Sequence, residues 1–101
     1  MSDNPSISVI VPVLNEEGSL EKFYRETSQS LSEYATWEII FVDDGSDDES
    51  YKIIQKLADN DNHVTVIRFF KNFGKSDALA DGFNFSNGDI VITIDADLQD
   101  D

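Results

Sequence analysis

The sequence predicts an α/β protein in which helices cover both faces of a Rossmann-like parallel sheet. Four short runs rich in apolar and β-branched residues alternate with three segments whose apolar residues recur at helical spacing. Strand, helix and strand repeated in this way are typical of right-handed crossovers between parallel strands. The first four strands of such a sheet take the spatial order 3-2-1-4, so we expect the first and fourth strands to lie side by side.

The first half of the chain supplies two of these strands and one helix. The first strand covers Ser6–Val13, SISVIVPV, and the polar segment LNEEGS ends it. The second strand covers Trp37–Asp44, WEIIFVDD, which is apolar almost throughout. The helix between them is predicted by residues at helical spacing, namely Leu20, Phe23, Tyr24, Thr27, Leu31 and Tyr34.

The second half supplies the remaining elements. Ser46 and Glu49 match the S-x-x-E capping box, which predicts the start of the second helix. The third strand is VTVIRFF, residues 64–70, and the fourth is DIVITID, residues 89–95. The two helices are predicted by Tyr51, Ile54 and Leu57, and, after Gly74, by Ala78, Leu79 and Phe83.

Length and composition exclude several kinds of protein. The 101 residues are expected to form one domain, residues 1–101. The formal net charge of −14 would repel phosphate backbones, which disfavours nucleic acid as a partner. Cys is absent and His63 is the only histidine, which disfavours disulfides, zinc sites and Ser-His-Asp chemistry. The sequence contains neither a bilayer-length apolar stretch nor a signal peptide, so we expect a soluble, cytoplasmic piece.

Acidic residues follow three of the predicted strands, at the edge where a ligand crevice opens in such sheets. Because extended residues alternate sides, Asp95, Asp97 and Gln99 are expected to face the same way. Three oxygen-bearing side chains suit a hard cation, Mg²⁺ or Mn²⁺, which would offset the charge of a bound diphosphate. The alternative is that this D-x-D pattern arises by chance in an acidic, solvated tail.

Three more residues near this edge are candidate nucleotide contacts. The first turn, PVLNEEGS, lacks G-x-G-x-x-G, which disfavours a dinucleotide cofactor. Asp43 and Asp44 end the second strand, where a carboxylate often binds a nucleoside, although DDGSDD would also serve as a loop and helix cap. Lys75 lies near the start of the third helix, where a bound phosphate would offset its unfavourable interaction with the helix dipole. Asp77 could do so without any ligand.

Four blocks of the sequence resemble, in order and spacing, the inverting glycosyltransferases of family 2. These blocks are SVIVPVLNEE, EIIFVDDGSDD, FFKNFGKSDALADGF and GDIVITIDADLQDD. Within that family they are most similar to the polyprenyl-phosphate sugar transferases, which include dolichol-phosphate mannose synthases and undecaprenyl-phosphate glucosyltransferases. The resemblance covers nearly the whole chain. It implies a GT-A fold that binds a UDP- or GDP-linked sugar together with Mg²⁺ or Mn²⁺.

The resemblance also implies roles for individual residues. Carried over by position, Pro12, Leu14 and Glu16 would line the nucleotide pocket, and Val42 and Asp44 would hold the base and ribose. Leu14 departs from the family pattern, because many relatives carry Tyr there. Asp95 and Asp97 would flank the diphosphate, and Asp97 and Gln99 would bind the metal.

The resemblance further implies that residues 1–101 are the N-terminal, donor-binding half of a hexosyltransferase, ending at its D-x-D motif. The general base is expected beyond Asp101, so the 101 residues alone are expected to be inactive in transfer. The acceptor would be a polyprenyl phosphate, the process cell-wall or lipid-linked glycan biosynthesis, and the parent protein would work at the cytoplasmic face of the membrane. Self-association is expected through the exposed edge of the fourth strand, helped by Phe70 and Phe73.

Other kinds of protein also place acidic residues at strand ends. In a receiver domain these residues follow strands one and three, and in a dehalogenase-type phosphatase the D-x-D pattern follows the first strand. Neither arrangement matches this chain, so Mg-dependent phosphotransfer is disfavoured. A nucleotide-binding module without catalysis remains an open alternative.

Overall fold

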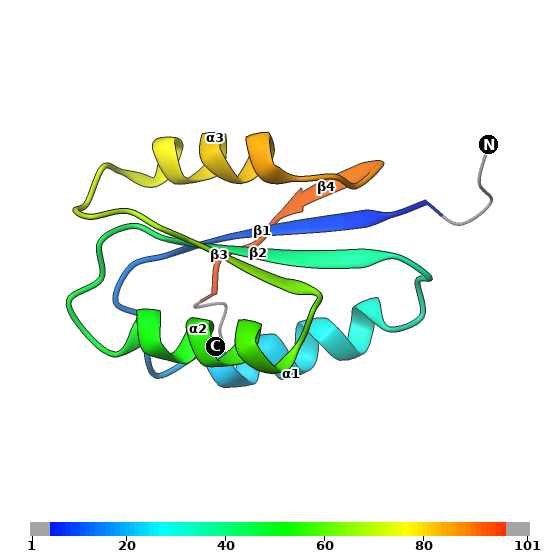
Figure 1. Cartoon of the computed structure of the whole chain (residues 1–101), viewed down its shortest axis with the longest axis horizontal. Helices are drawn as coiled ribbons and strands as arrows, with labels where there is room; N and C mark the ends of the chain where they lie inside the picture. The colour runs from blue at the N-terminus through cyan, green and yellow to red at the C-terminus, as the bar shows by residue number, and fades with distance from the viewer. Residues whose placement is uncertain (1–4, 97–101) are drawn as a thin grey trace.

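A computed structural model describes residues 5–96, and it contains one four-stranded sheet in the order β3-β2-β1-β4 (Figure 1). All pairings are parallel, which confirms the predicted topology. The strands are β1 (Ile7–Val13), β2 (Trp37–Asp43), β3 (Val64–Arg68) and β4 (Ile90–Thr93). The helices are α1 (Leu20–Leu31), α2 (Ser50–Asn60) and α3 (Lys75–Phe85).

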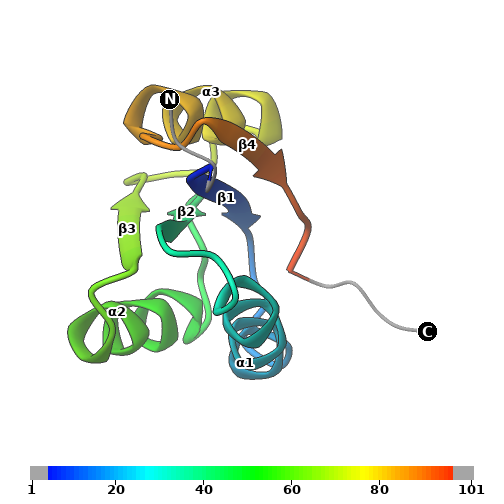
Figure 2. The ribbon, with the colours of Figure 1, turned by 90° about the vertical axis from the view of Figure 1, so that its right-hand side faces the viewer.

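Helices cover both faces of the sheet, as predicted. Figure 2 shows α1 and α2 below the sheet and α3 above it. Because strand residues alternate between faces, β1 and β2 contribute side chains to both layers of the core. On the α1–α2 face, Val9, Val11 and Phe41 are buried together with Phe23 of α1 and Ile54 of α2. The smaller cluster on the α3 face consists of Ile10, Ile40, Val42 and Ala78.

The strand register creates space at the carboxyl end of the sheet. β1 pairs with β2 along its whole length, from Ile7 with Trp37 to Val13 with Asp43. Its pairing with β4 begins at Ile7 but ends at Ile10, which is paired with Thr93. The last three residues of β1 therefore have a strand partner on one side only, so the crevice predicted between the first and fourth strands is open there.

The predicted capping box at the start of α2 is wrong. The helix begins at Ser50, and no side chain of the preceding residue caps it. The Ser46 hydroxyl instead accepts a hydrogen bond from the Asn15 N–H, and the Glu49 N–H donates to the Glu17 carboxylate. Ser46 and Glu49 thus bond to the β1–α1 loop, more than 30 residues away in sequence, instead of to each other.

The α3 face that packs on the sheet also differs from the prediction in one residue. Phe83 is 51% exposed, whereas its neighbour Gly82 is buried. A Cβ atom at Gly82 would lie 2.3 Å from Ile10 Cγ2, so only glycine allows the helix to approach β1 this closely. No helix within residues 5–96 has the length and apolarity required to cross a membrane.

Candidate functional site

A cavity of about 330 Å³ lies at the carboxyl edge of the sheet, where β1 extends beyond β4. It is formed by the end of β1, the loops that follow β1, β2 and β3, the first residue of α3 and the segment after β4. Six of the residues predicted to bind nucleotide line it. The lining residues are Pro12, Val13, Leu14, Glu16, Asp44, Asn72, Gly74, Lys75 and Asp95.

The charges around the cavity are three carboxylates and one ammonium group. The carboxylates belong to Glu16, Asp44 and Asp95. Lys75 Nζ lies 2.7 Å from Asp95 Oδ1, and both side chains are more than half exposed. Exposed ion pairs of this kind contribute only about 0–1 kcal/mol. A bound anion could therefore replace Asp95 as the partner of Lys75, and a cation could replace Lys75 as the partner of Asp95.

Asp95 faces the cavity because the chain keeps its alternation after β4. Ile94 and Ala96, on either side of it, pack into the apolar cluster between the sheet and α1. The Ile94 N–H also donates to the Ile10 carbonyl, which holds this segment beside β1. Because Ile94 and Ala96 pack on one side of the chain, the Asp95 carboxylate points to the other side, toward the cavity.

Asp44 forms a wall of the cavity and also holds the loop after β3. Its carboxylate accepts hydrogen bonds from the Phe73 N–H at 2.8 Å, the Gly74 N–H at 3.1 Å and the Asn72 side chain at 3.3 Å. The residue is only 3% exposed. Neither interpretation of the sequence included these contacts: the Asp44 carboxylate does not cap α2, and it binds the loop after β3 while lining the cavity. Asn72 and Gly74, which line the cavity, were missed for the same reason.

A second contact fixes the same loop. Gly45 has a φ of +80°, and a Cβ atom there would lie 2.5 Å from the Asn72 backbone nitrogen. The backbones of the β2–α2 and β3–α3 loops therefore touch. A side chain at position 45 would separate them, and the positive φ would add strain.

Asn15 connects the β1–α1 loop to the β2–α2 loop. Its backbone is left-handed, with a φ of 55°. Its side-chain oxygen accepts hydrogen bonds from the Asp47 N–H at 2.8 Å and the Asp48 N–H at 3.3 Å, and its own N–H donates to Ser46 Oγ at 3.0 Å. Its neighbours Leu14 and Glu16 line the cavity, so these bonds fix the position of that wall.

Asp48 adds a further hydrogen bond between the same two loops and a local one at the start of α2. Its carboxylate accepts from the Glu17 N–H at 3.2 Å and the Ser50 N–H at 2.9 Å. Burial raises the pKa of Asp48, but the hydrogen bonds from Ser50 and Glu17 outweigh it and hold the pKa below its ordinary value. The one signal of this network in the sequence was Asn15, because Asn tolerates left-handed backbone and bonds to nearby N–H groups.

Two predicted nucleotide contacts do not line the cavity. Val42 is fully buried in the cluster beneath α3. Asp43 is also fully buried, and its Oδ1 accepts a hydrogen bond from the Ser46 N–H at 3.1 Å. Its Oδ2 lies 3.9 Å from Nε of Arg68, whose guanidinium stacks on the Tyr51 ring. Both residues belong to β2, which directs them into the protein, whereas Asp44 follows the strand.

The expected metal site is only partly within the described residues. Asp97 and Gln99 lie outside them. Within residues 5–96, no group of three or more His, Cys, Asp or Glu side chains is arranged to hold a metal ion. Asp95 is half exposed at the cavity, and its carboxylate oxygens are ligands that suit Mg²⁺ or Mn²⁺. Of the three expected metal ligands, the described part of the chain thus contains Asp95.

The family model for glycosyl transferase family 2 matches residues 8–101. The chain belongs to this family. It is 45% identical over 95 residues to an undecaprenyl-phosphate 4-deoxy-4-formamido-L-arabinose transferase of Proteus mirabilis, with 92% of this chain and 29% of the relative covered. It is 46% identical over 96 residues to a bactoprenol glucosyl transferase of Shigella phage SfV, covering 93% and 31%. The chain thus spans less than a third of the length of these relatives.

Solved structures of glycosyltransferases share the fold. A mannosyltransferase from Pyrobaculum calidifontis, in complex with GDP-Man and Mn²⁺, superposes with a TM-score of 0.80 at 26% identity, covering 95% of this chain and 28% of that one. Glucosyl-3-phosphoglycerate synthase from Mycobacterium tuberculosis, in complex with Mn²⁺, UDP and glucosyl-3-phosphoglycerate, gives 0.71 at 30% identity, covering 94% and 34%. The expected GT-A-like fold is confirmed.

Proposed function

We propose that residues 1–101 form the donor-binding part of an inverting glycosyltransferase that transfers a sugar from a nucleoside diphosphate to a polyprenyl phosphate. The observation that carries the proposal is the cavity between the ends of β1 and β4, lined by Pro12, Leu14, Glu16, Asp44, Lys75 and Asp95. Two further facts support it: the family membership and the nucleotides bound by similar structures.

The cavity offers each part of a nucleotide a suitable surface. Leu14, 43% exposed, and Pro12 give an apolar wall for the base. The Asp44 carboxylate, already positioned by the loop after β3, can accept a further hydrogen bond from the base or ribose. Lys75, in the first turn of α3, would bind a diphosphate oxygen, where the helix N-terminus also favours negative charge.

A divalent cation fits the same arrangement. Asp95 would be one ligand, and Asp97 and Gln99 remain the proposed others. When bound, Mg²⁺ or Mn²⁺ would neutralise charge on the departing diphosphate. The protein residues bind and orient the donor, and this positioning supplies part of the rate.

The acceptor is proposed from the chemistry that the relatives' names state, undecaprenyl phosphate and bactoprenol. An oxygen of the acceptor phosphate would form the new bond to the anomeric carbon while the bond to the nucleoside diphosphate breaks. We propose that this reaction occurs at the cytoplasmic face of the membrane in the whole protein, and that the general base, where one is needed, lies outside residues 1–101.

Calorimetric titration of the 101-residue chain with UDP and with GDP, first with Mn²⁺ and then with EDTA, tests the donor site. We expect weak, metal-dependent binding without measurable sugar transfer. Asp95→Asn should weaken it about tenfold, the usual size of a lost charged contact. Asp59→Asn, an exposed carboxylate on α2, is the matched control. Binding that is unaffected by both EDTA and Asp95→Asn would refute the assignment.

A further inference from the structure

The loop between β3 and α3 differs in charge from the rest of the chain. The sequence contains 21 Asp and Glu residues, yet residues 62–76 contain none. Arg68, Lys71 and Lys75 are three of the seven Lys and Arg residues, and they fall within eight positions. We call residues 68–75, RFFKNFGK, the basic aromatic loop.

Apolar side chains of this loop are exposed beside its positive charge. Phe70 is 85% exposed, the highest value among the exposed large apolar residues of the described chain, and Phe73 is 43% exposed. Their ring centroids are 5.2 Å apart. Lys71 Nζ lies 5.8 Å from the Phe70 centroid and 5.2 Å from that of Phe73, and no carboxylate within residues 5–96 forms a salt bridge with it.

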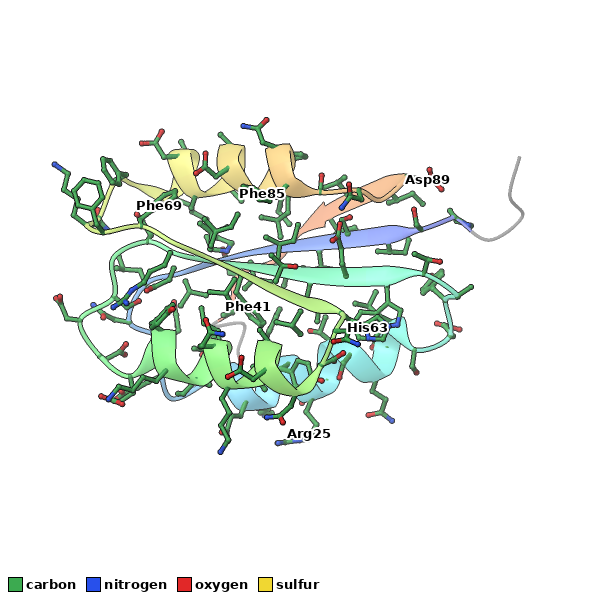
Figure 3. All side chains as sticks on the ribbon, in the orientation of Figure 1. Arg25, Phe41, His63, Phe69, Phe85 and Asp89 are labelled. Carbon is green, nitrogen blue, oxygen red and sulfur yellow. The ribbon has the colours of Figure 1, made fainter. Side chains whose placement is uncertain are left out.

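The exposure does not come from a loosely held loop. Asp44 accepts hydrogen bonds from the Phe73 and Gly74 N–H groups, and the backbone at Gly45 touches that of Lys71. Phe69, labelled in Figure 3, also packs its ring edge-to-face against Phe73, at 5.5 Å. The protein therefore holds two aromatic rings and a lysine outward at a fixed place.

The basic aromatic loop borders the candidate functional site. The basic aromatic loop lies at the same end as the loops that follow β1 and β2 (Figure 1). Three of its residues, Asn72, Gly74 and Lys75, line the 330 Å³ cavity, whereas Phe70 and Lys71 do not. The outward residues thus border the cavity without forming part of it.

We propose that the basic aromatic loop is a membrane-contact element that binds the surface of an anionic phospholipid bilayer. Phe70 and Phe73 enter the interfacial region, and Lys71 contacts lipid phosphates. Charge complementarity favours this partner through Lys71, which forms no salt bridge within residues 5–96, whereas Arg68 and Lys75 are paired with Asp43 and Asp95. Asp47 lines the same hollow as Phe70 and Lys71 and opposes this attraction, whereas repulsion from carboxylates farther than about 8 Å from the bilayer is screened at physiological salt. The apolar contact of the two exposed rings adds to the attraction by Lys71.

This proposal goes beyond donor binding and does not depend on it. Membrane contact through this loop would turn the cavity toward the bilayer, where a lipid-linked acceptor would be found. Its test is also independent, because vesicle binding is measured without any nucleotide. Conversely, Phe70→Ser should leave UDP and GDP titrations unchanged, since Phe70 does not line the cavity.

Flotation of the full 101-residue chain with vesicles tests the proposal. One set of vesicles is pure phosphatidylcholine, and the other contains roughly one third phosphatidylglycerol. We expect binding to the anionic vesicles and much less to the neutral ones. Lys71→Gln should reduce the partition coefficient roughly fivefold, and Phe70→Ser by a similar factor or more.

Matched controls make the same chemical changes elsewhere. Phe85→Ser replaces an aromatic residue that is 58% exposed at the opposite end of α3, and Lys52→Gln replaces an exposed lysine on α2. Circular dichroism should show all four variants folded, because each changed side chain is exposed. Equal binding to both kinds of vesicle, or equal losses in loop and control variants, would overturn the proposal. Self-association through Phe70 with no vesicle binding would also overturn it and assign the loop to a protein interface.

Discussion

Lys75 Nζ and Asp95 Oδ1, 2.7 Å apart, join the first turn of α3 to the segment after β4 across the candidate donor site. Lys75 belongs to α3, which packs on the face of β1. Asp95 follows β4, which pairs with the edge of β1. The sequence suggested a separate ligand for each of them, phosphate for Lys75 and metal for Asp95. The structure adds that, without ligands, each is the other's partner.

We predict that Lys75→Met weakens nucleotide binding about tenfold while changing the free energy of unfolding by less than about 1 kcal/mol. The affinity falls because a charged contact to phosphate is lost, and stability changes little because the ion pair is exposed. Calorimetry with GDP or UDP and urea unfolding measure the two effects. Lys56→Met, on α2, is the control. Unchanged nucleotide affinity in Lys75→Met would remove this residue from the donor site.

Asn15→Ala should destabilise the protein by about 1–3 kcal/mol, because two backbone N–H groups lose their acceptor and a left-handed residue loses its Asn side chain. Nucleotide affinity should fall as well, since Leu14 and Glu16 lose their support. Asn15→Gly relieves the backbone strain without restoring the hydrogen bonds, so it should recover part of the stability. Chemical unfolding of the three proteins separates these contributions. Asn60→Ala, at the end of α2, is the control, and an equal loss there would contradict the special role of Asn15.

The sequence predicted strand order and layers because these depend on patterns that repeat along the chain. Alternation and helical spacing identify the elements, and parallel strands with crossovers allow few windings. It also located most of the cavity, since the carboxyl ends of β1, β2 and β4 had to meet at one edge. It did not predict which of Asp43 and Asp44 faces the cavity, because one residue beyond a strand end reverses the direction of a side chain.

The sequence also did not predict the contacts between loops. Asn15 and Asp47 are 32 residues apart, and no periodicity connects them. Because Ser46 and Glu49 bond to the β1–α1 loop, they do not form the predicted capping box. Asp44 likewise has hydrogen-bond partners almost 30 residues away, in the loop after β3. Such contacts depend on the path of each loop after its strand, which propensities of single residues do not determine.

Alkaline pH should weaken the contact between α1 and the end of α2 that Tyr24 and Asp61 make. Burial, the hydrogen bond to Asp61 and the charge of that carboxylate raise the pKa of the Tyr24 hydroxyl from 10.0 to about 12. Since the folded pKa exceeds the unfolded one, the stabilisation is complete below pH 10 and is lost as the pH rises from 10 to about 12. Tyr24→Phe should therefore show a smaller fall in unfolding free energy across this window than the unmutated chain. Tyr34→Phe, at a 39% exposed site, is the control, and identical pH profiles for all three proteins would contradict the prediction.

Self-association through β4 remains a prediction, and the structure gives it a specific surface. Among the described residues, no strand pairs with the outer edge of β4, which Figure 2 shows at the side of the sheet. Ile90 and Ile92 are more than 40% exposed, and Ile92 and Ile94 line an apolar groove of about 430 Å³ between β4 and α1. Unpaired backbone groups next to exposed apolar side chains favour pairing with a second strand edge.

We expect sedimentation velocity at increasing concentration to show a dimer that Ile92→Lys abolishes. The lysine places charge in the groove, and charge at a strand edge opposes edge-to-edge pairing. Phe70→Ser is the comparison, because it removes the most exposed large apolar side chain of the described residues, which does not line this groove. A dimer that survives Ile92→Lys but disappears with Phe70→Ser would move the contact to the basic aromatic loop. A monomer at every concentration would show that the negative charge of the chain outweighs the attraction between β4 edges.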